Sequence, residues 1–264
     1  MAPARRRPGS GRRPDPPGRA RLDQRLVDAG LAATRSQAEA LIRAGRVLVD
    51  DAPVEKPGTR VRPEARLRLR GEERRFASRG GEKLASALAD LGVDPRGRRC
   101  LDVGASTGGF TDCLLRAGAR EVVAVDVGYG QLDPRLRADP RVRVLERTNA
   151  RHLEAAALGG PVELATVDVS FISVRLLLPR LRELAPEAEL LVLVKPNFEV
   201  GRGAVGKGGV VRDDAVREEA VRAVEAAAEA LGYAVAGRAD SRLAGPKGNR
   251  EVFVRLQPRA TPAR

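Results

Sequence analysis

Lysine is rare in this chain, and two of its lysines stand where a reaction could use them. Of the 48 lysine and arginine residues, five are lysines, and the two of interest are Lys83 and Lys195. Lys195 follows the apolar run LLVLV and precedes Pro196, which keeps residue 195 extended and ends the strand. An arginine guanidinium keeps its proton, whereas a lysine amine can release one when its surroundings favour the neutral form. Lys195 is therefore a candidate acid–base residue.

Acidic residues accompany these two lysines at the ends of the predicted strands. Asp168 follows the strand in ELATVDVS, Glu251 opens the last strand in EVFVRL, and Lys83 lies in SRGGEKL before the first strand. A surface ion pair is the simpler interpretation of any one of these residues. Ligands of open α/β sheets bind at the carboxyl ends of the strands, so four charged residues at that edge favour a reaction site.

A glycine-rich loop, LDVGASTGGF, follows the first predicted strand. Its glycines allow the sharp turn that a bound ligand requires at the end of a strand. Asp102 lies in this strand and Asp126 ends the next one, a spacing that suits a nucleoside whose ribose hydroxyls bond to a carboxylate. Asp126 has an alternative interpretation as a turn residue. No lysine follows the loop as in an ATP-binding P-loop.

Strands and helices alternate along residues 81–264, which predicts an α/β fold with a mostly parallel, seven-stranded sheet. Only SRLAGPKGNR joins the last two strands, YAVAGRAD and EVFVRL. This connection is too short for a crossover helix, so we expect the two strands to pair antiparallel.

Basic charge is concentrated at the front of the chain. The net charge is +13, and residues 1–80 contribute +10 of it, with 20 basic and 10 acidic side chains. We expect a disordered basic arm at 1–20, a small α+β domain at 21–69, a linker at 70–80 and the larger domain at 81–264. A basic front unit indicates an anionic partner, either nucleic acid or a membrane surface.

Several classes of protein are not favoured by this sequence. No apolar stretch is long enough to cross a bilayer and no secretory signal is recognisable, so we expect a cytoplasmic protein. Cys100 and Cys113 lack metal-ligand spacing, and His152 is the only histidine, so we expect no metal.

The front unit resembles the S4 RNA-binding domain over RLDQRLVDAGLAATRSQAEALIRAGRVLVDDAPVEKPGTRV. In that family the second helix and its surroundings present basic residues to structured RNA, whose recognition depends on phosphates, shape and 2′-hydroxyls. The resemblance implies RNA contacts from Arg35, Arg43, Arg46 and Lys56.

Residues 81–264 resemble S-adenosylmethionine-dependent methyltransferases of Rossmann-like fold, on the segments LDVGASTGGFTD, VVAVDVGYGQL, ERTNARHL and VDVSFIS. The resemblance implies S-adenosyl-L-methionine as cofactor, with the glycine loop around its methionine part, Asp126 at its ribose and Asn149 near its adenine. The residues implied to bind the cofactor are Asp102, Gly104, Ser106, Gly108, Gly109, Phe110, Asp126 and Asn149.

Lys83, Asp168, Lys195 and Glu251 match, in order and context, the catalytic set of ribose 2′-O-methyltransferases. The segments SRGGEKL, VDVSFIS, LVKPNFE and GNRE more narrowly resemble the FtsJ-like TlyA family of ribosomal RNA cytidine 2′-O-methyltransferases, also named haemolysin A. The resemblance implies methylation of ribosomal RNA or ribosomal subunits, and we expect the protein to be a monomer. Lys195 is the expected base, with Asp168 and Lys83 orienting it and Glu251 positioning both lysines, although which residue takes the proton stays open.

The resemblance also bears on the RNA target. The family's dual-target members carry an extra C-terminal helix, and the two prolines of RLQPRATPAR oppose such a helix here. We therefore expect large-subunit (23S) RNA as the main target, and methylation of small-subunit (16S) RNA as well is the alternative. Lys207 in VGRGAVGKGGVVR and Lys247 in GPKGNRE are candidate phosphate contacts, but both segments could be plain flexible connections.

Two other functions compete with this one. The first is an inactive, RNA-binding ribosome assembly factor, which the intact set of four charged residues opposes. The second is a membrane-active haemolysin, which the lack of a lytic amphipathic helix opposes.

Overall fold

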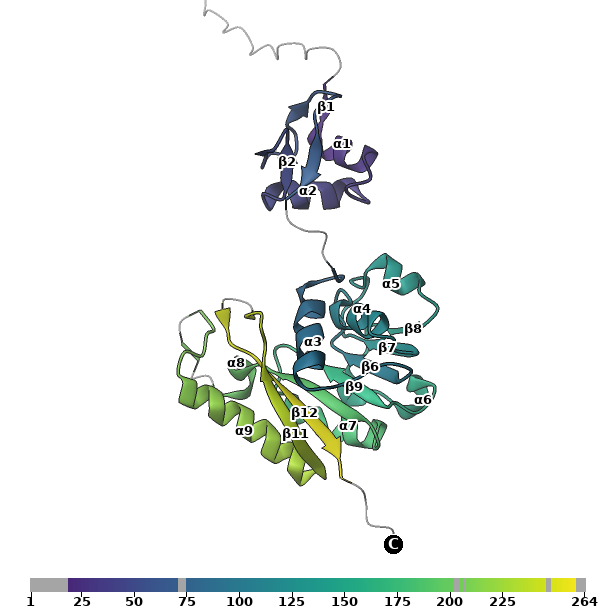
Figure 1. The fold of residues 1–264 in the computed structure, drawn as a ribbon, viewed down its shortest axis with the longest axis vertical. Helices are drawn as coiled ribbons and strands as arrows, with labels where there is room; N and C mark the ends of the chain where they lie inside the picture. The colour runs from purple at the N-terminus through teal and green to yellow at the C-terminus, as the bar shows by residue number, and fades with distance from the viewer. Residues whose placement is uncertain (1–18, 71–74, 202–204, 207, 246–247, 260–264) are drawn as a thin grey trace, which may run out of the picture. The chain divides into compact units, whose positions relative to one another are not determined.

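The computed structural model describes residues 19–70, 75–201, 205–206, 208–245 and 248–259. Its contacts divide the chain into two units, Met1–Glu73 and Arg74–Arg264. Figure 1 shows the helices and strands of each. The predicted basic arm lies outside the described residues up to residue 18.

The first unit is a small α+β domain with two antiparallel sheets, one pairing β1 with β4 and the other ordered β3-β2-β5. Its elements are β1 (Ala20–Arg21), α1 (Leu22–Asp28), α2 (Arg35–Arg43), β2 (Val47–Val49), β3 (Ala52–Pro53), β4 (Arg60–Val61) and β5 (Leu67–Leu69). The core between helices and strands includes the fully buried Leu22, Leu26, Ile42 and Val47.

Helix α2 begins with a cap formed by Thr34 and Gln37. Thr34 Oγ1 accepts a hydrogen bond from Gln37 N at 3.2 Å, and Gln37 Oε1 accepts one from Ala33 N at 2.8 Å. This reciprocal cap supplies acceptors to backbone donors that the first turn leaves free, which sets the start of the helix.

The second unit contains a seven-stranded sheet in the order β11-β12-β10-β9-β6-β7-β8. The strands are β6 (Arg99–Val103), β7 (Glu121–Val125), β8 (Val142–Leu145), β9 (Leu164–Val167), β10 (Glu189–Val194), β11 (Tyr233–Asp240) and β12 (Val252–Pro258). β8, β7, β6, β9 and β10 are parallel, while β12 runs antiparallel to both β10 and β11. The predicted sheet and its antiparallel last pair are confirmed.

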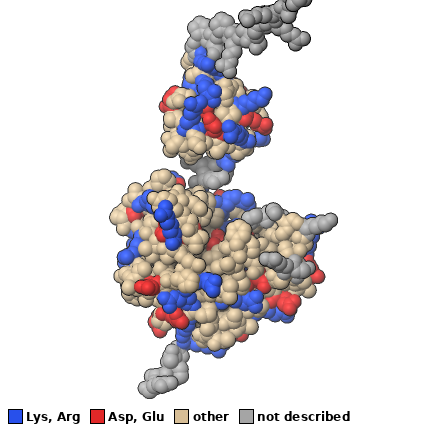
Figure 2. Space-filling view, turned by 180° about the vertical axis from the view of Figure 1, so that it is seen from behind, with Lys and Arg blue, Asp and Glu red and all other residues tan. Residues whose placement is uncertain are grey.

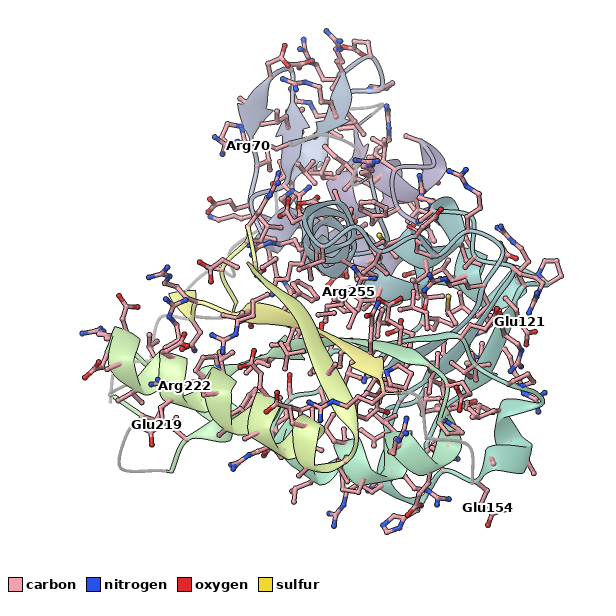
Figure 3. The ribbon with its side chains drawn as sticks, turned by 60° about the horizontal axis from the view of Figure 1, so that its bottom comes forward. Arg70, Glu121, Glu154, Glu219, Arg222 and Arg255 are labelled. Carbon is pink, nitrogen blue, oxygen red and sulfur yellow. The ribbon has the colours of Figure 1, made fainter. Side chains whose placement is uncertain are left out.

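Helices cover both faces of this sheet (Figure 1). Helices α3, α4 and α5 pack on one face, and α6, α7 and α9 on the other. The helical segments are α3 (Arg79–Asp90), α4 (Gly109–Arg116), α5 (Pro134–Ala138), the 3₁₀ turn η1 (Ala150–His152), α6 (Ala155–Leu158), the 3₁₀ turn η2 (Val174–Leu176), α7 (Leu178–Leu184), α8 (Pro196–Glu199) and α9 (Asp214–Ala230). Glu219 and Arg222 project from the exposed side of α9 (Figure 3).

Burial on both faces explains why the central strands are apolar throughout. In β10, Leu190 and Val192 face the core under α7 and α9, whereas Leu191 and Leu193 face the core under α3 and α4. Alternate side chains of a strand point to opposite faces, so a strand covered on both sides needs an apolar residue at nearly every position.

The ordered part of the second unit begins earlier than residue 81, inside the segment expected as a linker. Phe76 is buried in the core with Leu84, and α3 begins at Arg79. Ser78 Oγ accepts a hydrogen bond from Gly80 N at 3.2 Å and caps the helix. Lys83 therefore lies on the first helix of this unit.

Candidate active site

The charged residues predicted for catalysis gather at the carboxyl edge of the parallel strands. Asp168 directly follows β9 and Lys195 directly follows β10. Glu251 immediately precedes β12, whose first residue, Val252, pairs with Val194 at the end of β10. Because β12 runs antiparallel to β10, its start lies at the same edge as the ends of the other strands.

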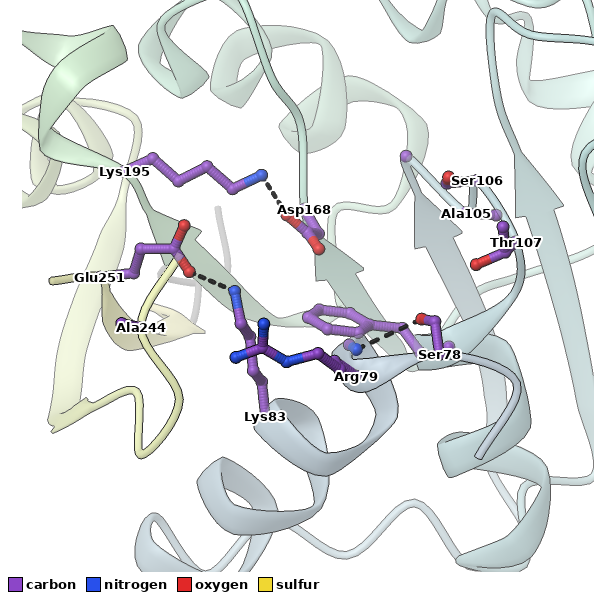
Figure 4. A pocket seen from close by; sticks show the side chains of 14 residues that line it. Ser78, Arg79, Lys83, Ala105, Ser106, Thr107, Asp168, Lys195, Ala244 and Glu251 are labelled. Atoms are coloured by element: carbon purple, nitrogen blue, oxygen red, sulfur yellow. Dashed lines mark hydrogen bonds and ion pairs between the residues drawn. The ribbon is translucent and has the colours of Figure 1, made fainter. Parts of the chain in front are cut away.

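Two ion pairs organise the four residues (Figure 4). Lys195 Nζ lies 2.5 Å from Asp168 Oδ1 and donates a hydrogen bond of 2.9 Å to Ser170 Oγ. Lys83 Nζ donates a hydrogen bond of 2.5 Å to Glu251 Oε2. The side chain of Glu251 is 1% exposed and that of Lys83 11%, so removing either partner would leave a charge with little water around it.

Close contact between two helices holds Lys83 in place. A Cβ atom on Gly81 of α3 would lie 2.8 Å from Gly109 O, and one on Gly109 would lie 2.9 Å from Gly81 N. A side chain at either position would push the helices apart. The two glycines therefore fix the distance between Lys83 and the glycine loop that precedes α4.

A cavity of about 290 Å³ brings the predicted catalytic residues and part of the glycine loop together. Its lining includes Lys83, Asp168, Lys195, Glu251, Gly104, Ser106, Gly109 and Phe110. Phe110 also stacks on Phe253, with ring centroids 6.0 Å apart. The cavity thus has charged groups on one side and backbone of the glycine loop on the other.

A second cavity of about 480 Å³ adjoins the first, because both are lined by Gly104, Ser106 and Asp168. Asp126 and Asn149, the two residues predicted to hold the cofactor's nucleoside, line this second cavity. Its wall also contains apolar side chains of the strands, including Val103 and Val125. The paired cavities therefore suit an elongated ligand with a nucleoside at one end.

Backbone donors fix the Asp126 carboxylate at the wall of this second cavity. Oδ2 accepts from Ser106 N at 2.8 Å, and Oδ1 accepts from Gly128 N at 2.6 Å. Each carboxylate oxygen has a further lone pair, so ribose hydroxyls can still donate to it. Asn149 Oδ1 accepts from Arg151 N at 3.0 Å, which leaves the amide nitrogen of Asn149 as a donor.

Gly104 links the cofactor loop to the catalytic edge. Its φ is +89°, and a Cβ atom there would lie 2.3 Å from the backbone oxygen of Asp168. Glycine is required because the loop after β6 passes directly against the end of β9.

Asp102 and Gly108 lie outside the lining of both cavities, unlike the other residues predicted to bind the cofactor. Asp102 is fully buried and accepts hydrogen bonds from Thr111 Oγ1 at 2.6 Å and Thr166 Oγ1 at 3.3 Å. Burial raises the pKa of Asp102 to about 7. Gly108 is the residue before α4, with φ +92°. A Cβ atom on Gly108 would lie 2.3 Å from the Leu136 side chain, so this glycine lets the loop enter α4 against α5.

The predicted RNA contacts of the first unit lie on its surface. Arg35 donates to the buried carboxylate of Asp23 at 3.1 Å, Arg43 pairs with Glu39 at 3.2 Å, and Arg46 donates to Arg70 O at 2.8 Å. Lys56 is exposed. The other two predicted contacts, Lys207 and Lys247, lie outside the described residues.

Ser170 and Phe171 belong to the site but were not predicted from the sequence. Ser170 accepts the hydrogen bond from Lys195 Nζ, and Phe171 lines the second cavity while its side chain is 88% exposed. Phe171 has a φ of +71°, which is strained for a phenylalanine. The sequence feature that could have predicted Phe171 is an aromatic residue in the turn that follows a strand and its terminal charged residue, Asp168.

The described part of the chain contains no group of three or more histidine, cysteine, aspartate or glutamate side chains that could hold a metal ion. No helix within the described ranges is long and apolar enough to span a membrane.

The sheet order, the glycine loop after β6 and the acidic residue after β7 define the class of Rossmann-like, S-adenosylmethionine-dependent methyltransferases. Enzymes of this fold bind S-adenosylmethionine as a general property. The FtsJ-like methyltransferase family matches residues 76–257, and the S4 domain matches residues 20–67.

Comparison with known proteins narrows the class. The chain is 51% identical to "16S/23S rRNA (cytidine-2'-O)-methyltransferase TlyA" of Mycobacterium tuberculosis, over 90% of each chain. It is 38% identical to "Hemolysin A" of Brachyspira hyodysenteriae, over 70% of this chain and 78% of the relative. A solved protein from Streptococcus thermophilus, named as a hemolysin, is 39% identical with a TM-score of 0.72, over 93% of this chain and 90% of that one. The chain belongs to the TlyA family of FtsJ-like methyltransferases.

Proposed function

We propose that this enzyme transfers a methyl group from S-adenosylmethionine to the ribose 2′-hydroxyl of a cytidine in ribosomal RNA. The observation that carries the proposal is the pair of lysine–carboxylate contacts, Lys195 with Asp168 and Lys83 with Glu251, in one cavity beside the glycine loop. The similarity to the TlyA protein of Mycobacterium tuberculosis supports the choice of cytidine and of ribosomal RNA.

The cofactor supplies an activated methyl group when it is bound, so the protein must align the acceptor oxygen and remove its proton. Lys195 takes this proton at Nζ when its amine is in the neutral form, and becomes the ammonium that pairs with Asp168. Asp168 and Ser170 hold Nζ from the side of the strand ends, which directs the amine into the cavity. Lys83, fixed by Glu251, donates to the acceptor oxygen and orients it.

Exposed groups around the cavities suit an RNA substrate. Phe171 offers a bare aromatic face beside the second cavity, and unstacked bases bind to such faces. The first unit supplies a surface rich in arginine, on which Arg43 and Lys56 are exposed. Figure 2 shows lysine and arginine side chains spread over the displayed face of this unit.

Large-subunit RNA is the target that the sequence favours, and small-subunit RNA is the second target because the Mycobacterium tuberculosis relative is named for both. The first experiment therefore measures transfer of labelled methyl from S-adenosylmethionine to separated large and small ribosomal subunits, followed by nuclease mapping of the labelled nucleotide. Equal labelling of both subunits would reject the preference for the large one.

Lys195→Arg and Lys195→Ala test the base in the same assay. We expect both variants to lose at least about a hundredfold in kcat, since general-base catalysis contributes on that order, while both still bind S-adenosylhomocysteine like the wild type. Near-normal activity of Lys195→Arg would show that the site works by charge and alignment alone. Binding of cofactor and RNA by the wild type without methyl transfer would instead support an inactive assembly factor.

A further inference from the structure

Arg79 is the third basic side chain in the lining of the first cavity, and the proposed chemistry does not use it. It is the first residue of α3, one helical turn before Lys83. Figure 4 shows its guanidinium on the side of the cavity where Lys83 and Glu251 lie, away from Ser106 and Thr107 of the glycine loop.

The charges of the cavity leave Arg79 unmatched. Lys83 is paired with Glu251, and Lys195 is paired with Asp168. Within the described residues, no carboxylate forms an ion pair with Arg79 and no protein group accepts a hydrogen bond from its guanidinium. With both lysines protonated in their ion pairs, three cations and two carboxylates give the cavity a formal charge of +1, and the unpaired cation is Arg79.

We propose that Arg79 binds the phosphodiester group on the 3′ side of the ribose that is methylated. This inference rests on the proposed function, because it takes the acceptor to be a ribose 2′-hydroxyl. The 3′-oxygen, which carries that phosphate, is on the carbon next to the one that bears the 2′-hydroxyl. An acceptor oxygen placed at Lys195 and Lys83 therefore brings a negative phosphate into the same cavity, and a guanidinium fork matches phosphate oxygens in pairs.

The cofactor's carboxylate is the other anion that Arg79 could meet. The predicted position of the methionine part is against the glycine loop, whereas the guanidinium of Arg79 lies toward the Lys83–Glu251 pair. This placement favours the RNA phosphate. It also implies that the enzyme selects a nucleotide inside an RNA chain over one at a free 3′ end, where this phosphate is missing.

The test compares wild type, Arg79→Gln and Arg79→Lys with Arg96→Gln as the matched control. Arg96 is exposed, precedes β6 and lines neither cavity. Three quantities are measured in the full chain: the Kd of S-adenosylhomocysteine, the Kd of ribosomal RNA against salt, and kcat and KM for methyl transfer.

We expect Arg79→Gln to weaken RNA binding by about tenfold or more, the usual loss for a charged hydrogen bond. The slope of log Kd against log salt should fall by about 0.7 to 0.9, which corresponds to one phosphate. Arg79→Lys should restore the slope but only part of the affinity, and S-adenosylhomocysteine binding should change less than twofold. RNA affinity and slope equal to those of Arg96→Gln would overturn the proposal, as would a tenfold loss confined to cofactor binding.

A modified RNA identifies the phosphate. Once the methylated cytidine is mapped, a fragment is made with an uncharged methylphosphonate at its 3′ linkage. This change should weaken binding to wild type as much as Arg79→Gln does, with no further loss when the two are combined. Additive losses would place Arg79 on another phosphate and overturn the 3′ assignment. Salt-dependent binding needs no methyl transfer, so an inactive wild type would refute the proposed function while the contact of Arg79 with phosphate is still measured.

Discussion

At the scale of single residues, two buried aspartates have pKa values shifted in opposite directions by their surroundings. Asp102 is buried beneath the glycine loop with two threonine hydroxyls as partners, and burial raises its pKa to about 7. Asp23 is equally buried in the first unit, but hydrogen bonds from Arg21 and Arg35 lower its pKa to about 2.

We expect Asp102 to make the folded state less stable as pH rises. Between about pH 4 and pH 7 the carboxyl ionises in the unfolded chain but stays protonated in the folded one, so unfolding releases a proton. The free energy of unfolding of the wild type should therefore fall relative to that of Asp102→Asn by at most about 1.4 kcal/mol per pH unit in this window. Denaturant unfolding at several pH values measures the difference.

Asp23→Asn provides the comparison of opposite sign. The pKa of Asp23 is lowered, so its contribution is complete above about pH 4 and lost as pH falls toward 2. The difference in unfolding free energy between wild type and Asp23→Asn should thus shrink on acidification. If the Asp102→Asn curve runs parallel to that of the wild type from pH 4 to 7, Asp102 ionises normally in the fold.

At the scale of elements, a buried carboxylate joins the two segments that follow β9 and β10. Glu199, at the end of α8, accepts hydrogen bonds from Ser173 Oγ at 2.5 Å and from Val174 N at 2.7 Å. Phe198 contacts Phe171 across the same junction, with ring centroids 5.5 Å apart. Glu199 therefore fixes the turn after Asp168 against the turn after Lys195.

Glu199→Ala should loosen this junction. The loss of hydrogen bonds to a charged group predicts a decrease of about 2 kcal/mol in the free energy of unfolding. We also expect a lower kcat, because the positions of Asp168 and Ser170 around Lys195 depend on the turn. Urea unfolding and the methyl-transfer assay measure the two effects.

Glu183→Ala is the matched control for this change. Glu183 is 64% exposed and pairs with Arg180 one helical turn away, an arrangement that contributes less than about 0.5 kcal/mol. A Glu199→Ala enzyme as stable and active as Glu183→Ala would mean that the junction does not hold the site.

At the scale of the whole molecule, most of the net positive charge and the reaction site lie in different parts of the chain. Residues 1–80, which include the S4-like domain, carry +10 of the net charge of +13, while both cavities lie in the methyltransferase unit. Affinity for RNA and the rate of methyl transfer should therefore respond to different substitutions.

The double variant Arg43→Gln/Lys56→Gln tests this separation. We expect a higher KM for ribosomal RNA and a shallower salt dependence of binding, by about 0.7 to 0.9 in slope for each charge that contacts a phosphate. The kcat at saturating RNA should stay unchanged, because neither residue lines a cavity.

The control removes two arginines of similar exposure from the other unit, as Arg96→Gln/Arg222→Gln. Arg222 is 65% exposed on the outer side of α9. Equal effects of the two double variants on KM and on the salt slope would contradict RNA binding by the first unit.

Local sequence was sufficient to predict the strands of the large sheet, its longest C-terminal helix and the family. Some features depend only on residues a few positions apart, so the sequence alone predicts them. They include the cap at Thr34, the apolar run of β10 and the glycine loop. The antiparallel last pair of strands followed from the short connection between Asp240 and Val252, which leaves no room for a crossover helix.

Only the tertiary structure decided which charges meet. Lys83 and Glu251 are 168 positions apart, and their contact depends on β12 entering the sheet beside β10 and on α3 packing against α4. Asp102 looked like a cofactor ligand in the sequence, but it is buried beneath the loop. The sequence by itself determined which residues are available and where each strand lies along the chain. The order of the strands within the sheet was decided by burial of its two apolar faces, and that order brings the paired charges together.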